Sequence, residues 1–116
     1  MEEKNKVSIW LGNFDNEDLF DDFMEEKYDE EGDVSSLFME SFEIDFIDNQ
    51  FQEVLYDKNL KKEVLIPVSY SSFFLNKVEV DYSKYNCVVL LYNFRYMGGI
   101  TKTSDFDFIG VYDYRD

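Results

Sequence analysis

A run of five apolar residues, Cys87-Val88-Val89-Leu90-Leu91, does most to limit what this chain can fold into. It lies in a stretch from about Asn86 to Tyr96 that has the residue types of a β-strand. Because neighbouring residues of a strand point to opposite faces, both faces of this strand must be covered. The sequence therefore predicts a strand in the middle of a sheet. Cys87 is the only cysteine of the chain, and we expect it to be buried as a small hydrophobic side chain.

A second strand is predicted over residues 7–12 (Val7-Ser8-Ile9-Trp10-Leu11-Gly12). Alternation places Val7, Ile9 and Leu11 on one face. Trp10 falls on the opposite face, where we expect it to pack beneath a helix.

The last strand is predicted from Phe106 to Tyr114, and we expect it to pair with the 86–96 strand as an antiparallel hairpin. The loop between them contains Gly98-Gly99 and is longer than the tightest hairpin loops. Aromatic residues on these strands are expected to belong mostly to the core, and an exposed tyrosine could anchor an interface. They are Tyr92, Phe94 and Tyr96 on one face of their strand, and Tyr112 and Tyr114 on one face of the last.

The predicted helices are short. One is expected over about residues 16–26, capped by Asp15 or Asn16. Others are expected to begin at Ser35 or Ser36 and near Ser71 or Ser72, and extended segments are expected over 42–47 and 52–56. This order predicts an α+β fold, with a single domain over residues 1–116. Its twisted, mainly antiparallel sheet would carry two or three short helices on one side.

The charge balance excludes several classes of function. The chain has 26 acidic and 11 basic residues, a net charge of −15, so it should repel nucleic acid and anionic membranes and attract basic surfaces. It has no histidine and one cysteine, which excludes His-based triads, histidine metal ligands, internal disulfides and Cys-based zinc sites. A free thiol without an apolar leader or a membrane-length apolar run leads us to expect a cytoplasmic location.

The densest acidic stretch, Asp29-Glu30-Glu31-Gly32-Asp33, does not fit a calcium loop. Placing Gly32 at the sixth position of an EF-hand loop puts Lys27 at the first and Phe38 at the twelfth, and neither side chain can bind calcium. No spacing of serine or lysine residues indicates a nucleophile with its base, and Gly98-Gly99 does not open a helix as a phosphate loop would. We therefore predict no catalytic residue, no metal and no cofactor.

Acidic residues are concentrated between residues 15 and 33, where eleven of them occur with Lys27 as the only base. On the predicted helix they form four like-charge pairs four residues apart, which together cost about 1–2 kcal/mol. Spread charges would keep the chain soluble equally well, although solubility remains an alternative reason for the acid. We predict instead a face that binds a basic partner. Its residues are Asp18, Asp21, Asp22, Glu25, Asp29, Glu30, Glu31 and Asp33.

Several segments, in the same order along the chain, resemble the immunity protein 22 family of bacterial polymorphic toxin systems. They are Val7–Phe14, the stretch from Asp29 to Phe46, Ser69–Phe73, Val89–Phe94 and Phe108–Tyr112. The resemblance implies a cytoplasmic, non-enzymatic antidote that binds and blocks the effector domain of a toxin encoded beside it. It implies no catalytic residue, and it indicates that Trp10 and Gly12 serve the fold.

The partner is accordingly expected to be a cognate toxin with a basic surface. If the toxin is a nuclease, its substrate channel should be basic, and an acidic protein could block it. Two other functions stay open: an acidic adaptor or nucleic-acid mimic that binds a different basic protein, and a small carboxylate enzyme. We expect a monomer or a homodimer, since an exposed edge strand could pair two copies.

Overall fold

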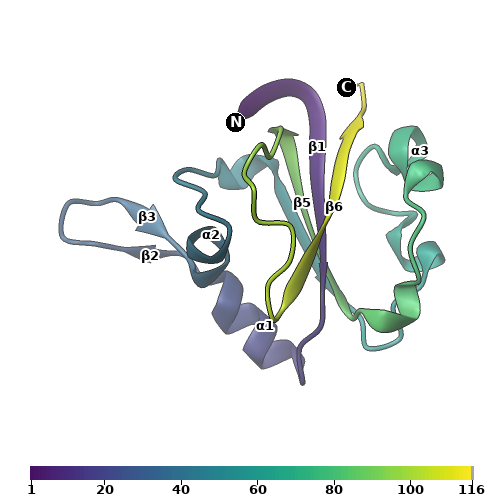
Figure 1. The fold of residues 1–116 in the computed structure, drawn as a ribbon, viewed down its shortest axis with the longest axis horizontal. Coiled ribbons are helices and arrows are strands. Elements are labelled where there is room, and N and C mark those ends of the chain that lie inside the picture. Colours follow the sequence, from purple (N-terminus) through teal and green to yellow (C-terminus); the bar gives the residue numbers. More distant parts are fainter. Residues whose placement is uncertain (116) are drawn as a thin grey trace.

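The two strands with the longest buried runs lie at the centre of the sheet in the computed structural model, which describes residues 1–115 (Figure 1). The strands and helices are β1 (Glu2–Gly12), α1 (Glu17–Met24), β2 (Lys27–Tyr28), β3 (Val34–Ser35), α2 (Leu37–Ser41), β4 (Gln52–Tyr56), α3 (Ser71–Phe74), β5 (Cys87–Phe94) and β6 (Phe106–Asp113). Short 3₁₀ helices occur at Asn49–Phe51, Lys62–Leu65, Leu75–Lys77 and Tyr82–Lys84. The main sheet has the order β4-β5-β1-β6 with antiparallel neighbours throughout, which confirms the predicted α+β class.

The predicted hairpin between the last two long strands is wrong, because β1 lies between β5 and β6. Ile9 of β1 is opposite Leu90 of β5 on one side and Gly110 of β6 on the other. Residues 7–12 are buried throughout, and a strand without solvent contact needs a neighbour on each edge. The connection between β5 and β6 is long enough to cross β1 and packs over it through Tyr96.

Helices cover both faces of the sheet, so the prediction of helices on one side is wrong (Figure 1). The layer on one face contains α1 and α2. The layer on the other is formed by residues 57–86, which include α3. The physical reason is already visible in β5: its alternate residues Val88 and Leu90 enter one core cluster, while Val89 and Leu91 enter the other. Two apolar faces require two covering layers.

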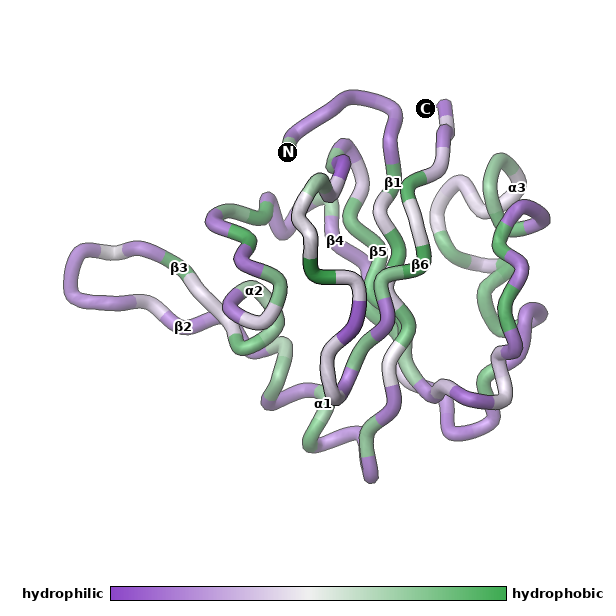
Figure 2. Tube along the Cα trace, viewed as in Figure 1, coloured by the Kyte–Doolittle hydropathy of each residue, from purple (hydrophilic) through white to green (hydrophobic). Residues whose placement is uncertain are grey.

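Trp10 packs as predicted on the face opposite Val7, Ile9 and Leu11, and it has no exposed surface. The ring of Phe38 in α2 meets it edge-on at 5.2 Å between centroids, and Phe42 and Tyr96 make similar contacts. Cys87 is fully buried on the same face, which confirms its predicted place. Figure 2 shows the resulting concentration of hydrophobic residues along the central strands.

Several boundaries differ from the predictions for local reasons. Residues 42–47 are irregular rather than extended, because they follow the end of α2 and pair with no strand. The strand Gln52–Tyr56 is confirmed at both ends. Tyr92 packs on the opposite face of the sheet from Phe94 and Tyr96, so their predicted common face is wrong; Asn93 has a φ of +53°, which breaks the alternation. Within residues 1–115, no helix is long and apolar enough to cross a bilayer.

Candidate functional site

Helix α1 presents the first part of the predicted partner-binding set. Asn16 caps it, its side-chain oxygen accepting a hydrogen bond from the backbone N–H of Leu19 at 3.0 Å. Phe20 is its fully buried residue, with Phe23 partly buried beside it, so the opposite side of the helix faces solvent. The helix ends at Met24, two residues earlier than predicted, so two of the four predicted like-charge pairs, Glu17–Asp21 and Asp18–Asp22, lie within it and the prediction of the other two is wrong. Three of the predicted residues lie on it and one caps its end, all four exposed: Asp18, Asp21, Asp22 and Glu25.

The acidic loop after α1 is the tip of a hairpin that projects from the molecule (Figure 1). Asp29 shapes the tip: one of its carboxylate oxygens accepts hydrogen bonds from the backbone N–H groups of Glu31 at 2.8 Å and Asp33 at 2.9 Å. Gly32 has a φ of +85°, which favours glycine at this turn. Asp29 therefore has a structural role, whereas the exposed carboxylates of Glu30, Glu31 and Asp33 make no such contact and face solvent.

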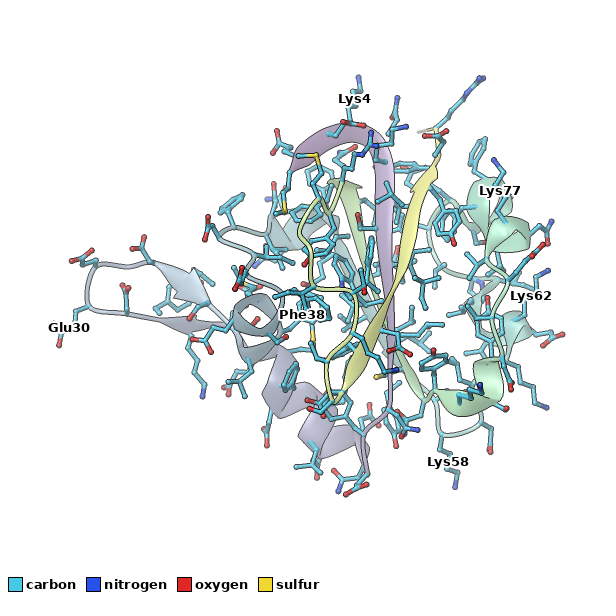
Figure 3. All side chains as sticks on the ribbon, viewed as in Figure 1. Lys4, Glu30, Phe38, Lys58, Lys62 and Lys77 are labelled. Carbon is cyan, nitrogen blue, oxygen red and sulfur yellow. The ribbon has the colours of Figure 1, made fainter. Side chains whose placement is uncertain are left out.

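The structure gathers these carboxylates into one layer, residues 15–48, which we call the acidic layer. It contains fifteen acidic residues and one lysine, so it carries −14 of the net charge of −15. The layer on the other face, residues 57–86, has four acidic and five basic residues. Figure 3 shows this separation: Glu30 lies at the tip of the hairpin, and Lys58, Lys62 and Lys77 lie at the opposite end of the molecule.

The chain's own cations do not neutralise the acidic layer. Within residues 1–115, the ion pairs join Lys6 to Asp113, Arg95 to Glu3 and Lys102 to Asp107. All three lie outside residues 15–48. The ion pairs among the described residues therefore leave the charge of this layer uncompensated.

Exposed aromatic rings lie among the carboxylates of the acidic layer, and the sequence pattern did not predict their exposure. Phe46 is 69% exposed and Tyr28 is 70% exposed, and Phe51, which lines a groove together with Phe46, is 42% exposed. The predicted anchors on β5 and β6 are instead mostly core, as expected: Tyr92 and Tyr114 are buried. The alternation of residues 42–47 predicts an extended segment with Phe46 on the same face as Phe42 and Ile44, and this pattern does not distinguish the exposed Phe46 from its two buried neighbours.

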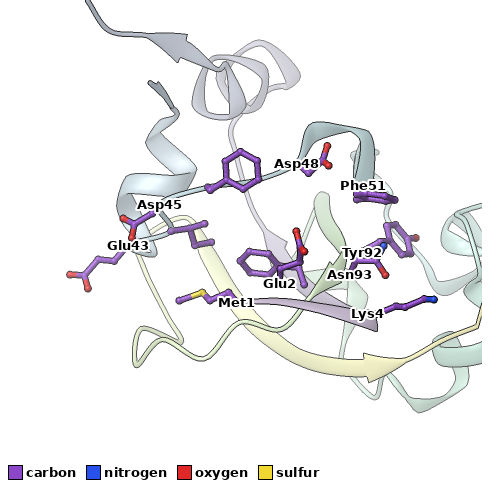
Figure 4. A pocket seen from close by; sticks show the side chains of 12 residues that line it. Met1, Glu2, Lys4, Glu43, Asp45, Asp48, Phe51, Tyr92 and Asn93 are labelled. Carbon is purple, nitrogen blue, oxygen red and sulfur yellow. The ribbon is translucent and has the colours of Figure 1, made fainter. Parts of the chain in front are cut away.

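Two grooves flank Phe46. The first has a volume of about 560 Å³, and its lining includes Phe46 and Phe51 with the carboxylates of Glu2, Glu43, Asp45 and Asp48 (Figure 4). The second has a volume of about 610 Å³, and its lining includes Phe46 and Tyr28 with the carboxylates of Glu26, Asp33, Asp45 and Asp48. The two grooves therefore combine exposed aromatic surface with carboxylates.

Of the described groups with shifted pKa values, Tyr92 lines the first groove, where burial raises the pKa of its phenol, and the others line neither groove. Burial raises the pKa of the Cys87 thiol to about 12, which keeps it protonated and unreactive. Burial and a 2.6 Å hydrogen bond to Asp107 raise the pKa of Tyr85 to about 12, and the same bond, with Lys102, lowers the pKa of Asp107. Within residues 1–115, no group of three or more acidic or cysteine side chains is placed to hold a metal ion. The shifts therefore reflect packing.

Comparison with known families decides the identity. The model of the family described as Immunity protein 22 matches residues 7–115. The chain belongs to the immunity protein 22 family. Membership confirms the resemblance and implies inhibition of a cognate toxin by a protein that is not an enzyme. No curated protein and no solved structure matches the chain.

Gly12 lies at a position where a side chain would clash with its neighbours. A Cβ atom added there would lie 2.7 Å from two ring carbons of Phe106 and 2.8 Å from the backbone oxygen of Asp105. Those distances are shorter than any ordinary contact. With the buried Trp10, this agrees with the structural roles that the resemblance implied for both residues.

Proposed function

We propose that this immunity protein neutralises its toxin by placing the acidic layer against a basic surface of the toxin's effector domain. The observation that carries the proposal is the separation of charge: −14 within residues 15–48, on one side of the sheet, without internal ion pairs among the described residues. Such a distribution attracts a basic partner from a distance and orients it before contact.

A nuclease effector domain is the toxin type that this charge fits best. Its substrate channel must be basic, since it binds a polyanion. An acidic layer of similar charge density would compete for the same surface and exclude the nucleic acid. In this function Asp18, Asp21, Asp22 and Glu25 act from α1, while Glu30, Glu31 and Asp33 act from the hairpin. Asp29 contributes by shaping the turn on which they stand.

The test uses the effector domain encoded by the adjacent gene. Adding the immunity protein in equimolar amounts should abolish nuclease activity, and the affinity should fall as salt rises. Inhibition that is independent of salt, or a toxin whose contact surface carries no excess of basic residues, would contradict the electrostatic mechanism. Binding to several unrelated DNA-binding proteins would instead support a general nucleic-acid mimic.

A pair of charge reversals identifies the surface. Glu30→Lys with Glu31→Lys should lower the association rate constant about 10-fold at low salt, because both residues lie in the turn that joins β2 to β3 at the tip of the hairpin. The matched control, Glu63→Lys with Glu79→Lys, changes the net charge equally on the other face, where both residues are exposed. Equal effects of the two double variants would show that total charge, rather than the acidic layer, drives association.

A further inference from the structure

We infer that a basic segment of the toxin docks on Phe46, with an arginine side chain lying against the ring and its neighbours entering the two flanking grooves. This inference rests on the proposed function and names the contact at its centre. Phe46 lines both grooves and leaves 69% of its surface to solvent. In most interfaces a few large side chains in pockets near the centre supply most of the binding energy. An exposed ring between two grooves is suited to such a contact.

The sequence holds Phe46 in this position from both sides. Before it, the backbone N–H of Ile44 donates to the carbonyl oxygen of Met39 at 2.8 Å, and Glu43 adopts a φ of +56°, which together end α2 in a Schellman motif. The side chain of Ile44 is buried and anchors the turn. After it, Asp48 accepts a hydrogen bond from the N–H of Gln50 at 3.0 Å and starts the next turn. The backbone is therefore held on both sides of Phe46, while the ring of Phe46 is exposed to solvent.

The charges around Phe46 select a cationic occupant. Six carboxylates line the two grooves, against the single lysine Lys4, which lies on the β1 side of the first groove (Figure 4). None of these carboxylates forms an ion pair within residues 1–115. Asp45 and Asp48 line both grooves and flank Phe46 in sequence. A cation over the ring would therefore have carboxylates within reach on either side.

Arginine suits this geometry better than lysine. Its planar guanidinium stacks on an aromatic face and still pairs with carboxylates at its edge, whereas an ammonium is strongly hydrated. Arginine is also enriched among the residues that dominate interface energies. The apolar parts of the grooves, which Phe51 and Tyr28 provide, would accommodate the aliphatic stems and apolar neighbours of the basic segment.

Another exposed apolar patch, on the opposite face, provides the comparison. Ile66 and Phe73 are 59% and 44% exposed, but they belong to the layer in which basic residues outnumber acidic ones. A basic partner would gain no electrostatic attraction there. Phe73 is therefore a matched control for Phe46: the same residue type, exposed, on the other side of the sheet.

The experiment measures binding kinetics with an inactive variant of the effector domain encoded by the adjacent gene. Phe46→Ala should raise the dissociation rate constant at least about 10-fold, with an association rate constant within about 3-fold of wild type. Phe73→Ala should change both by less than about 2-fold. The double variant Glu2→Gln with Asp45→Asn should reduce the salt dependence of the affinity, which Phe46→Ala should preserve.

The outcomes separate this inference from the function on which it rests. If wild type binds and inhibits while Phe46→Ala behaves like Phe73→Ala, docking on Phe46 is refuted and the proposed function stands. If wild type neither binds nor inhibits the toxin, the proposed function fails first. If Phe46→Ala instead abolishes self-association in sedimentation without changing toxin binding, a second copy occupies the grooves and the inference is overturned. Thermal unfolding of each variant verifies that its fold is intact.

Discussion

Reversing two charges on α1 should make the protein more stable and a poorer inhibitor. Asp21→Lys with Asp22→Lys replaces two like-charge pairs of the helix, Glu17–Asp21 and Asp18–Asp22, with attractive pairs. Each pair changes from a cost to a gain of about 0.2–0.5 kcal/mol, so the two reversals give about 1–2 kcal/mol. Lysine in the last turn also suits the negative end of the helix dipole. The gain corresponds to roughly 4–8 °C in Tm for a chain of this size.

Two measurements check this prediction. Urea unfolding should show a higher midpoint for the double variant at low salt, and the gain should shrink in 0.5 M NaCl, where charges are screened within about 5 Å. Stopped-flow mixing with the toxin's effector domain should show association about 10-fold slower at low salt. The control Glu63→Lys with Glu79→Lys has the same net charge. Unchanged stability would refute the helix energetics, and unchanged association would refute a binding role for α1.

Three further predictions concern the fold. Phe38→Ala should lower the free energy of unfolding by about 3–5 kcal/mol in urea melts, since its ring is fully buried against Trp10; a loss below 1 kcal/mol would contradict this packing. Gly12→Ala should cost about 1–3 kcal/mol in the same assay because its Cβ meets the ring of Phe106, and wild-type stability would contradict the clash. Tyr85→Phe should cost about 1 kcal/mol at pH 7 by removing the hydrogen bond to Asp107. Since the folded pKa of Asp107 is lowered, that stability is present above the unfolded pKa of about 4 and is lost as pH falls through the folded pKa. The difference in stability between the two proteins in urea melts should therefore shrink as the pH falls below about 4, and a constant difference would contradict the linkage.

Local sequence patterns were sufficient to predict the elements whose burial depends on the order of apolar and polar residues within the element. The apolar run of β5 predicted a central strand, and the alternation around Trp10 predicted which face each residue of β1 occupies. Both follow from a period of two and the need to cover apolar faces. Capping by Asn16 and Ser36 likewise depends on neighbouring residues alone.

The strand order could not be read in the same way. Pairing of β1 between β5 and β6 joins residues about 80 to 100 positions apart, and no local pattern distinguishes it from a hairpin of the last two strands. The exposure of Phe46 was missed for a related reason. Its alternation with Phe42 and Ile44 suggests an extended segment, but Glu43 adopts a left-handed backbone conformation, which interrupts the extended chain. The concentration of acidic residues, in contrast, could be predicted from the sequence, because the acidic segments follow one another along the chain and fold into one layer.

In the proposed function, attracting a basic partner and stabilising the fold place opposite requirements on a surface, and the two faces of the sheet meet them separately. A face that attracts a basic partner must hold many like charges, which lowers its own stability. Here that cost falls on a layer of short elements, α1, the β2–β3 hairpin and α2. The buried segments of β1 and β5 and the nearly neutral layer on the other face supply the core that offsets it. Charge alone gives fast encounter but weak discrimination, since any polycation experiences the same field. If the toxin docks on Phe46 as we infer, the exposed ring adds a contact that only a segment of complementary shape can make. The combination requires that charge variants act on association and Phe46 variants on dissociation; if both classes changed the same rate constant, this division of roles would be wrong.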